Sequence, residues 1–337
     1  MPSDKHMPLD KVLDLLKAWA IDVESFEVDP DFSHICQVTA STGERYILKN
    51  VGELNDTISP LEQQHRVTQY LHRSGVRLGY LLTTQDGGFY ATDGVDAFTL
   101  MPHLEREKTN LFTDTAGPIY YNIGRAYAHL HTVLAAYKGE INSWKTNIYS
   151  RLFEFSVPRM RERQSGEKRD QLEVILSGLE SPIAGISPNL GEQPVLWDCH
   201  TGNTLIYDGQ VSGFVDCDHI SIGPRICDIG NFSANLVAFD CSSSRTEPWL
   251  SHLPSLLHGF ASATTLTPEE RTAFPLAIPF FLLVLLDHFQ EHGPQKNATK
   301  VFDSTWWVYN NLHRIRAATQ TTFSNDTESE NHNKAKK

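Results

Sequence analysis

Basic residues are scarce in this chain of 337 residues. It has 29 lysines and arginines against 41 aspartates and glutamates, which gives a formal net charge of −12 at pH 7. Non-specific binding to nucleic acid depends on lysine and arginine that neutralise phosphates, so this balance argues against a nucleic-acid partner. An acidic chain is compatible with a cationic small-molecule partner.

Cysteines and long apolar runs are also few. The five cysteines are odd in number and form no CxxC pair, which favours free thiols and a reducing compartment. The N-terminus lacks the apolar core of a signal peptide. The longest apolar run, 277–286, is shorter than the ~20 residues that cross a bilayer. We therefore expect a cytoplasmic protein with no membrane partner, in which this run is a buried helix.

The first hundred residues combine strand and helix patterns. Apolar residues at helical spacing predict a short amphipathic helix over 8–19. Alternating apolar and polar residues predict a hairpin around Ser41-Thr42-Gly43, and further turns at Asp86-Gly87 and Asp93-Gly94. A Ser-Pro start and a Gly stop mark a helix over 59–75. These signals indicate a small, mostly antiparallel sheet that carries one helix.

Helical patterns dominate the chain after Pro102. Apolar residues from Ile123 to Leu134 fall on one face of a helix. Further helices are predicted over 142–162, 169–180, 245–263 and 268–291. We therefore expect an α+β fold with a small antiparallel-sheet lobe over 1–102 and a mostly helical lobe over 103–320. The polar tail, 321–337, has little to bury and is expected to be disordered.

Carboxylates are concentrated in residues 195–218, which read VLWDCHTGNTLIYDGQVSGFVDCD. The longer stretch from Gly191 to Cys241 holds seven acidic side chains and one basic one, Arg225. Carboxylates crowded in this way repel one another unless a positive charge compensates them. We expect that charge to come from outside the chain.

The Asp208-Gly209 pair is a strong signal for a two-residue hairpin turn. In such a hairpin Asn203 lies opposite Phe214, and Asp216 points to the same face because side chains alternate with a period of two. Carboxylate and amide oxygens suit Mg²⁺. With Asp198 five residues before Asn203, the set is typical of phosphoryl transfer, in which one carboxylate handles a hydroxyl proton beside a metal.

Two other interpretations of this region are weaker. The acids could belong to solvated turns rich in Asp and Asn. A zinc site could be sought among the histidines and cysteines, but their spacings lack CxxC or HxxxH regularity, so packing is the better account. Those side chains are Cys199, His200, Cys217, His219 and Cys227. His131, on the predicted helix after Pro102, is likewise expected to pack or to lie at the surface.

The ordered set of motifs resembles the aminoglycoside phosphotransferase and choline kinase-like superfamily over most of the chain. The catalytic and metal-binding loops of that superfamily, usually written HGDxHxxN and then IDxD, are matched by WDCHTGN, FVDCD and GPRICDIGNF. Its nucleotide-lysine strand is matched by RYILKN, its acidic helix by SPLEQQHRVTQYL, its hinge by FTLMPHL and its long helix by IGRAYAHLHTVL. The DCHTGN wording is most similar to the homoserine kinase-like and stress-response kinase branches.

The resemblance implies a two-lobed protein kinase-like fold that binds ATP and Mg²⁺ in its cleft. Asp198 would be the catalytic base, and Asn203 and Asp216 would hold magnesium. Lys49 would contact the α and β phosphates, steadied by Glu62. Magnesium would then supply part of the missing positive charge, and a cationic amino alcohol could supply the rest.

The resemblance also implies supporting roles, which we state as expectations. Asp228 would brace the catalytic loop, and Asp218 would line the acceptor side. The backbone from Leu100 through Met101 to His103 would meet the adenine. Ser33 and backbone N–H groups would cradle the phosphates. In the helices after residue 236, three side chains are candidate acceptor contacts, although a solvated helix end explains them equally well: Asp287, His288 and Glu291.

The chain departs from the superfamily pattern in three places. Leu196-Trp197 replaces the His-Gly before the catalytic aspartate, and the bulky Trp197 could narrow the acceptor pocket. The phosphate-covering loop, 29–35, has no glycine. Gln64 stands where another register would put the acid assigned to Glu62.

We therefore expect transfer of the γ-phosphate of ATP to a hydroxyl of a small molecule. Homoserine, choline, ethanolamine and an aminoglycoside are all candidate acceptors. One alternative is a protein Ser/Thr kinase of the stress-response type, which shares the catalytic loop but accepts a polypeptide. The other is a pseudokinase that binds nucleotide without catalysis, which the Leu196-Trp197 replacement suggests.

Overall fold

The computed structural model describes residues 9–30, 32–142, 147–239 and 241–320. It divides into two compact units. The sheet unit comprises Met1–Arg106 with Tyr137–Ile141 and Ser212–Asp218, and the helical unit comprises Glu107–Ala136, Asn142–Val211 and His219–Lys337. The sheet unit thus includes two short segments from later in the chain, so no single boundary along the sequence separates the two units. The tail expected to be disordered, 321–337, lies outside the described residues.

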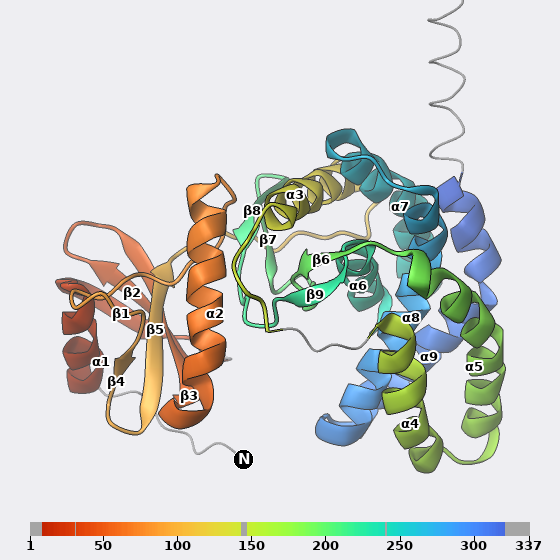
Figure 1. The fold of residues 1–337 in the computed structure, drawn as a ribbon, viewed down its shortest axis with the longest axis horizontal. Helices are drawn as coiled ribbons and strands as arrows, with labels where there is room; N and C mark the ends of the chain where they lie inside the picture. The colour runs from red at the N-terminus through yellow and green to blue at the C-terminus, as the bar shows by residue number, and fades with distance from the viewer. Residues whose placement is uncertain (1–8, 31, 143–146, 240, 321–337) are drawn as a thin grey trace, which may run out of the picture. The chain divides into compact units, whose positions relative to one another are not determined.

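The sheet unit is built on five antiparallel strands in the order β1-β2-β3-β5-β4 (Figure 1). The predicted hairpin joins β2 to β3, and Gly43 in its turn has a left-handed φ of 84°. The strands are β1 (Val23–Val28), β2 (Ile35–Ala40), β3 (Arg45–Glu53), β4 (Ala91–Thr92) and β5 (Asp96–Pro102). Strand β1 was not among the predicted elements.

Only one of the two Asp-Gly turns after residue 80 connects strands. The Asp93-Gly94 turn joins β4 to β5 as expected. The Asp86-Gly87 turn forms, with the Gly87 N–H donating to the Thr84 carbonyl at 3.0 Å, but no strands flank it. The backbone before it bonds elsewhere: the Leu82 N–H donates to Leu100 and the Gln85 N–H to Ala18, both at 2.8 Å. These separate partners prevent a ladder.

Two helices pack on this sheet. Helix α1 (Leu9–Leu16), followed by a 3₁₀ turn η1 (Lys17–Trp19), buries Val12 and Leu16 in an apolar cluster with strand residues such as Leu48. Helix α2 (Leu54–Arg73) ends before Gly75, whose φ is 85°. The prediction that α2 starts at Ser59-Pro60 is wrong, because the helix begins earlier and Pro60 lies inside it. The Leu54 N–H, which bonds to the Val95 carbonyl at 3.0 Å, fixes the true start.

The helical unit holds most of the remaining secondary structure (Figure 1). Its helices are α3 (Gly117–Ala135), the π-helical segment η2 (Ser150–Ser156), α4 (Val157–Arg163), α5 (Gly166–Ile186), a 3₁₀ turn η3 (Ser187–Asn189), α6 (Ile226–Val237), α7 (Ser243–Ala263), α8 (Pro268–His292) and α9 (Gln295–Asn310). Helix α3 packs along α7 because Gly124 and Gly259 allow close approach. A Cβ on either glycine would lie 1.9 Å from a carbonyl oxygen of the other helix. The predicted class, a small antiparallel sheet followed by a mostly helical remainder, is confirmed.

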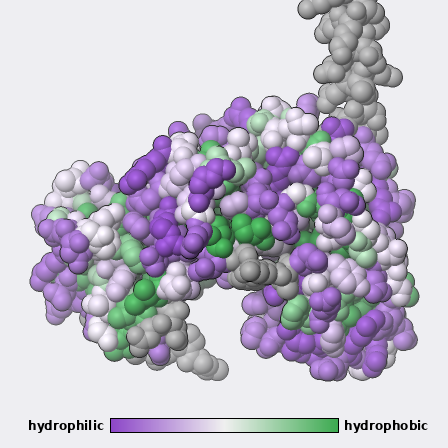
Figure 2. All heavy atoms as spheres, in the orientation of Figure 1, coloured by the Kyte–Doolittle hydropathy of each residue, from purple (hydrophilic) through white to green (hydrophobic). Residues whose placement is uncertain are grey.

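Among the described helices, α8 is long and apolar enough to cross a membrane by composition alone. However, 72% of its most apolar window is buried inside the protein. The run 277–286 is therefore part of a buried helix, as predicted, although that helix is longer than the run. Hydrophilic side chains dominate the visible face of both units in Figure 2.

Two small sheets position the acidic stretch. Strand β6 (Glu192–Val195) pairs antiparallel with β9 (Ser221–Pro224) inside the helical unit. Strands β7 (Thr204–Tyr207) and β8 (Gln210–Phe214) form the predicted hairpin. Its turn residues, Asp208 and Gly209, have φ angles of 50° and 65°, which a type I′ turn requires.

Candidate active site

The loop after β6 is held by a buried carboxyl group. Asp228, in the first turn of α6, is 0% exposed and accepts hydrogen bonds from the Leu196 N–H (2.8 Å) and the Trp197 N–H (3.0 Å). Its Oδ2 also lies 2.9 Å from Nε2 of His131 on α3, which is equally buried. His131 is therefore packed and paired rather than exposed. Three donors on two other elements thus fix the Asp228 carboxyl group beneath the loop that carries Asp198.

Trp197 adopts a backbone conformation that is rare for a bulky residue. Its φ is 65°, in the left-handed region, which costs about 1–3 kcal/mol for a residue with a side chain. Asp228 holds its N–H, and the Asn231 amide donates to its carbonyl. The indole packs against Phe281, with ring centroids 5.9 Å apart, and over Gly223, where a Cβ would lie 2.5 Å from the ring. A glycine, which the superfamily pattern has at this position, would adopt this φ without strain.

Asp198 and Asn203 form a second contact set within the helical unit. The Asn203 side-chain amide donates to the Asp198 carboxylate Oδ2 at 2.9 Å and to the Asp198 carbonyl at 3.1 Å. The Asn203 backbone N–H bonds to the His200 carbonyl at 3.0 Å, and the side chain is 8% exposed. Because the amide nitrogen faces Asp198, the amide oxygen is the atom that could coordinate a cation.

Asp198 is held in its ionised form. Burial would raise its pKa, but His200, whose Nε2 lies 3.7 Å from Oδ2, the charge of His219 and the Asn203 amide together outweigh burial. The pKa of Asp198 therefore lies below the usual value of an aspartate. A carboxylate in this state can accept a hydrogen bond from a hydroxyl and receive its proton.

Lys49 supplies a counter-charge that the sequence did not reveal. Its Nζ pairs with Oδ1 of Asp216 inside the sheet unit, across 167 residues of sequence. Asp216 has a φ of 57°. Arg225, the one basic residue of the acidic stretch, pairs instead with Glu270 of α8 at 2.6 Å. The chain itself thus neutralises one of the clustered acids, so not all of the positive charge has to come from outside.

The expected pair between Lys49 and Glu62 is not formed, and this prediction is wrong for the structure. Glu62 instead lies 3.1 Å from Arg66, one helical turn along α2, with its side chain 56% exposed. Leu61 and Gln64, its neighbours on α2, are buried, at 4% and 6% exposure. Glu62 is rotated onto the solvent face, and Gln64, the alternative position, carries no charge.

The expected nucleotide-binding backbone is partly engaged. The Leu100 carbonyl accepts from the Leu82 N–H at 2.8 Å, and the His103 N–H donates to the Arg45 carbonyl at 2.9 Å. The His103 N–H is therefore engaged within the sheet unit, and the contact of this backbone with adenine stays a prediction. Met101 is 6% exposed in β5.

The side chains of two further predicted residues are exposed in the sheet unit. Ser33 lies between β1 and β2, where the His34 carbonyl accepts from the Asn50 N–H at 2.8 Å. Asp218 lies at the end of the segment Ser212–Asp218. Asp216 belongs to this unit and Asn203 to the helical unit, so the shared face expected for those two side chains remains a prediction.

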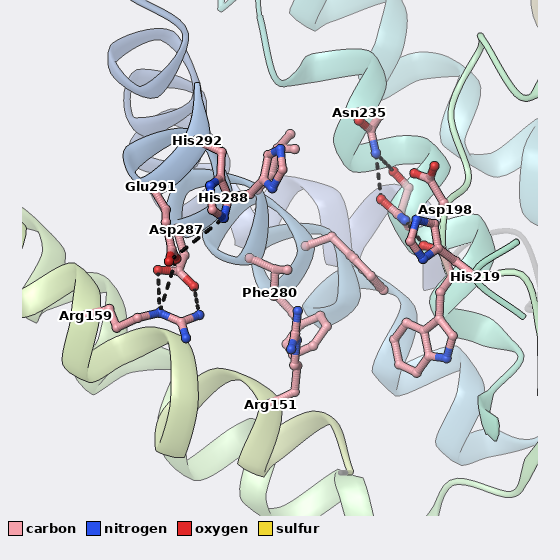
Figure 3. Close-up of a pocket in the computed structure, with 15 residues that line it drawn as sticks. Arg151, Arg159, Asp198, His219, Asn235, Phe280, Asp287, His288, Glu291 and His292 are labelled. Carbon is pink, nitrogen blue, oxygen red and sulfur yellow. Dashed lines mark hydrogen bonds and ion pairs between the residues drawn. The ribbon is translucent and has the colours of Figure 1, made fainter. Parts of the chain in front are cut away.

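A cavity of about 440 Å³ opens within the helical unit (Figure 3). It brings together five residues that the sequence singled out: Trp197, Asp198, Asp287, His288 and Glu291. His219, which was expected to pack, lines it as well, and five further polar lining residues were not predicted: Arg151, Arg159, Asn231, Asn235 and His292. The spacing of Asn231 and Asn235, one turn apart in a largely apolar helix, was a signal that could have indicated these two.

Asp287 lines this cavity but is already compensated. Its side chain is 5% exposed. Arg159 donates to both of its oxygens, and Arg163 lies 3.1 Å from Oδ1. The two arginines compensate the charge of Asp287, and its contact with an acceptor stays a prediction.

The metal-binding capacity of the site depends on oxygen donors. Within the described residues, no group of three or more His, Cys, Asp or Glu side chains is placed to hold a metal ion. Mg²⁺ needs no such group, since it commonly binds through one or two protein oxygens together with phosphate oxygens and water. The Asn203 amide oxygen in the helical unit and the Asp216 carboxylate in the sheet unit are each a donor of this kind.

Comparisons with known proteins are consistent with phosphoryl transfer. The model of the phosphotransferase enzyme family matches residues 27–251. No curated protein sequence matches the chain significantly.

Solved structures with the same fold are distant in sequence. An aminopropanol kinase associated with a microcompartment has a TM-score of 0.67 at 15% identity, covering 93% of this chain and 98% of its own. An amicoumacin kinase in complex with AMP-PNP and Ca²⁺ has a TM-score of 0.65 at 15% identity, covering 91% and 94%. An aminoglycoside phosphotransferase from Alicyclobacillus acidocaldarius has a TM-score of 0.63 at 13% identity, covering 94% and 96%.

Proposed function

The chain belongs to the phosphotransferase enzyme family, and we propose that it moves the γ-phosphate of ATP to a hydroxyl of a small molecule, with Mg²⁺ as cofactor. The observation that carries this proposal is Asp198, an ionised carboxylate that lines a cavity of about 440 Å³ and is held by the Asn203 amide. A cavity of this size accommodates a small molecule. The acceptors in the names of the similar structures, aminopropanol, amicoumacin and aminoglycosides, support a small acceptor.

In the proposed reaction Asp198 orients the acceptor hydroxyl and receives its proton. The acceptor oxygen forms a new bond to the γ-phosphorus, the bond to the β–γ bridging oxygen breaks, and ADP leaves with that oxygen. The proton on Asp198 then passes to solvent. Because Asp198 is ionised well below neutral pH, it is ready to accept this proton at physiological pH.

Lys49 and Asp216 would serve the nucleotide. Their charges neutralise each other in the structure. Lys49 would hold the negative phosphates of ATP and Asp216 would hold the cation, so each side chain would still face an opposite charge. When bound, Mg²⁺ would offset negative charge on the phosphates, with Asn203 and Asp216 as its protein ligands.

The test is acceptor-dependent ADP formation by the full chain. A panel of amino alcohols, hydroxy acids and aminoglycosides is offered with ATP, with and without Mg²⁺. We expect at least one acceptor to stimulate ADP formation only when Mg²⁺ is present. Asp198→Asn should lower that rate by about 10³-fold or more, since it removes the proton acceptor. Asp208→Asn, in the exposed hairpin turn, is the matched control and should keep the wild-type rate.

Other outcomes contradict the proposal. If a generic protein substrate is phosphorylated and no alcohol is, the acceptor is a polypeptide. If nucleotide binds and the rate of ADP formation is the same for wild type and Asp198→Asn, the catalytic role of Asp198 fails.

A further inference from the structure

Three polar side chains share one face of the largely apolar helix α6. Asp228, Asn231 and Asn235 are spaced three and four residues apart, which places them on successive turns of the same face. This face is turned toward the loop that carries Asp198, because the Asp228 carboxylate accepts from two backbone N–H groups of that loop. The two asparagines are therefore placed to reach the same backbone.

The asparagines of α6 hold carbonyl groups of this loop. The Asn231 amide donates to the Trp197 carbonyl. The Asn235 amide nitrogen lies 2.6 Å from Oδ1 of Asn231 and 3.4 Å from the Cys199 carbonyl oxygen, and Figure 3 shows Asn235 pointing from α6 toward the loop. A carbonyl only accepts, so the nitrogen of each amide must face the loop, and the oxygen of Asn231 then accepts from Asn235. Asn235 therefore orients the amide of Asn231.

Three successive carbonyl groups around the catalytic aspartate thus have asparagine donors. Asn203 donates to the carbonyl of Asp198 itself at 3.1 Å, between the contacts that Asn231 and Asn235 make. Asn231 is 7% exposed, and both α6 asparagines line the cavity next to Asp198. A backbone held on both sides of Asp198 fixes the direction in which its carboxylate points.

Trp197 is the residue of this loop whose conformation most depends on such contacts. Its φ of 65° is unfavourable for a residue with a side chain. Asp228 holds its N–H and Asn231 holds its carbonyl, so the peptide groups on both sides of its Cα are fixed. Without the bond from Asn231, the tryptophan would relax toward negative φ, and the peptide that leads into Asp198 would turn with it.

We propose that Asn231 is a positioning residue for phosphoryl transfer, required because a tryptophan occupies this strained position, and that Asn235 orients it. This inference rests on the proposed function. Asn231 acts through the backbone of the loop rather than on a reacting atom. A glycine adopts a φ of 65° without strain, so the requirement for Asn231 should largely disappear when Trp197 is replaced by glycine.

The test is a double-mutant cycle between Asn231→Ala and Trp197→Gly, measured as acceptor-dependent ADP formation. In the otherwise wild-type chain we expect Asn231→Ala to lower kcat by about 10²-fold, the effect of a ~1 Å displacement of a reacting group. The KM values for ATP and acceptor should change by less than about threefold, because the ligand contacts remain. In the Trp197→Gly background the same substitution should lower kcat by less than about threefold.

Asn122→Ala is the matched control. Asn122 lies on α3 and donates to the Gly209 carbonyl at 2.9 Å, so this variant loses the same kind of bond at a place that does not line the cavity. Its kcat should stay within about twofold of the wild-type value. Asn235→Ala is a milder variant that keeps Asn231 and should lower kcat by about tenfold. It tests the proposal even if circular dichroism and thermal melting show that Asn231→Ala is unfolded.

Hydrogen exchange separates failure of this inference from failure of the proposed function. Exchange of the backbone amides in 195–200 is followed by mass spectrometry without substrates. Asn231→Ala should speed this exchange by at least about tenfold, and by less in the Trp197→Gly background, whereas Asn122→Ala should leave it unchanged. If exchange behaves in this way but no acceptor stimulates ADP formation, the proposed function fails while the support of the loop by Asn231 stands.

Three results would overturn the inference. The first is an equal loss of kcat on Asn231→Ala in both backgrounds, which would show that the strain at Trp197 is irrelevant. The second is a rise in KM with an unchanged kcat, which would make Asn231 a binding residue. The third is wild-type hydrogen exchange of 195–200 in Asn231→Ala.

Discussion

Replacing Asp228 with asparagine would test most directly how the loop that carries Asp198 is held in place. The substitution keeps the volume of the side chain but removes one of its two acceptor oxygens. In the structure the Leu196 N–H bonds to Oδ2 and the Trp197 N–H bonds to Oδ1, so both oxygens are used by backbone donors. An asparagine can satisfy one of them, and its NH₂ group then faces the other donor.

The magnitude follows from these contacts. A buried donor left without a partner costs about 1–3 kcal/mol, and a hydrogen bond to a charged group contributes about 1.5–3 kcal/mol. The bond to His131 is weakened as well. We therefore expect Asp228→Asn to lower the free energy of unfolding by about 3 kcal/mol. Because Trp197 needs its N–H held to stay at a φ of 65°, the loop should shift, and a shift of ~1 Å can lower kcat by ~10²-fold.

Urea unfolding followed by tryptophan fluorescence, together with acceptor-dependent ADP formation, measures both effects. Asp208→Asn is again the matched control, since asparagine suits the left-handed turn position and the side chain is exposed. It should change the free energy of unfolding by less than about 0.5 kcal/mol. If Asp228→Asn unfolds at the wild-type urea concentration and keeps its kcat, the reasoning about the loop is refuted.

Three further predictions concern the reacting groups. The pKa of Asp198 is depressed, so kcat/KM should stay level through neutral pH and fall only in acid; His200→Gln removes a neighbour that lowers this pKa and should move the fall to higher pH, and an unmoved pH profile would contradict the assignment. Lys49→Met should raise the KM for ATP by roughly tenfold or more while leaving the KM for the acceptor nearly constant, and the opposite pattern would place Lys49 elsewhere. Gly223→Ala should push the Trp197 indole out of its position, since the new Cβ would lie 2.5 Å from the ring, and should change the KM for the acceptor more than that for ATP; equal changes would argue against Trp197 as a cavity wall.

The features that could be predicted from the sequence are those set by local signals. The turn at Asp208-Gly209 requires positive φ at two adjacent positions, which few residue pairs adopt. The hairpin could therefore be predicted from these two residues. Gly43 fixed the earlier hairpin, and Gly75 fixed the end of α2, for the same reason. The start of α2 was misjudged because Pro60 usually marks a first turn, whereas the contact of Leu54 with Val95 sets the start.

The parts of the site that could not be predicted depend on pairings across long sequence separations. Nothing local to Lys49 indicates that Asp216 is its partner, 167 residues away. Glu62 and Gln64 differ by two positions on a helix, and only the packing of α2 decides which of them faces the solvent. The sequence around Asp287 does not show that the acid is paired, because its partner Arg159 lies 128 residues earlier in the chain.

The most direct test of the account follows the γ-phosphate itself. The full chain is incubated with ATP labelled at the γ-position, Mg²⁺ and the acceptor that best stimulates ADP formation, and the products are separated by chromatography. We predict that the label appears on the acceptor as a phosphate ester with wild-type protein and stays in ATP with Asp198→Asn. Label that appears only as inorganic phosphate or on the protein, or an ester formed equally well by Asp198→Asn, would contradict the account.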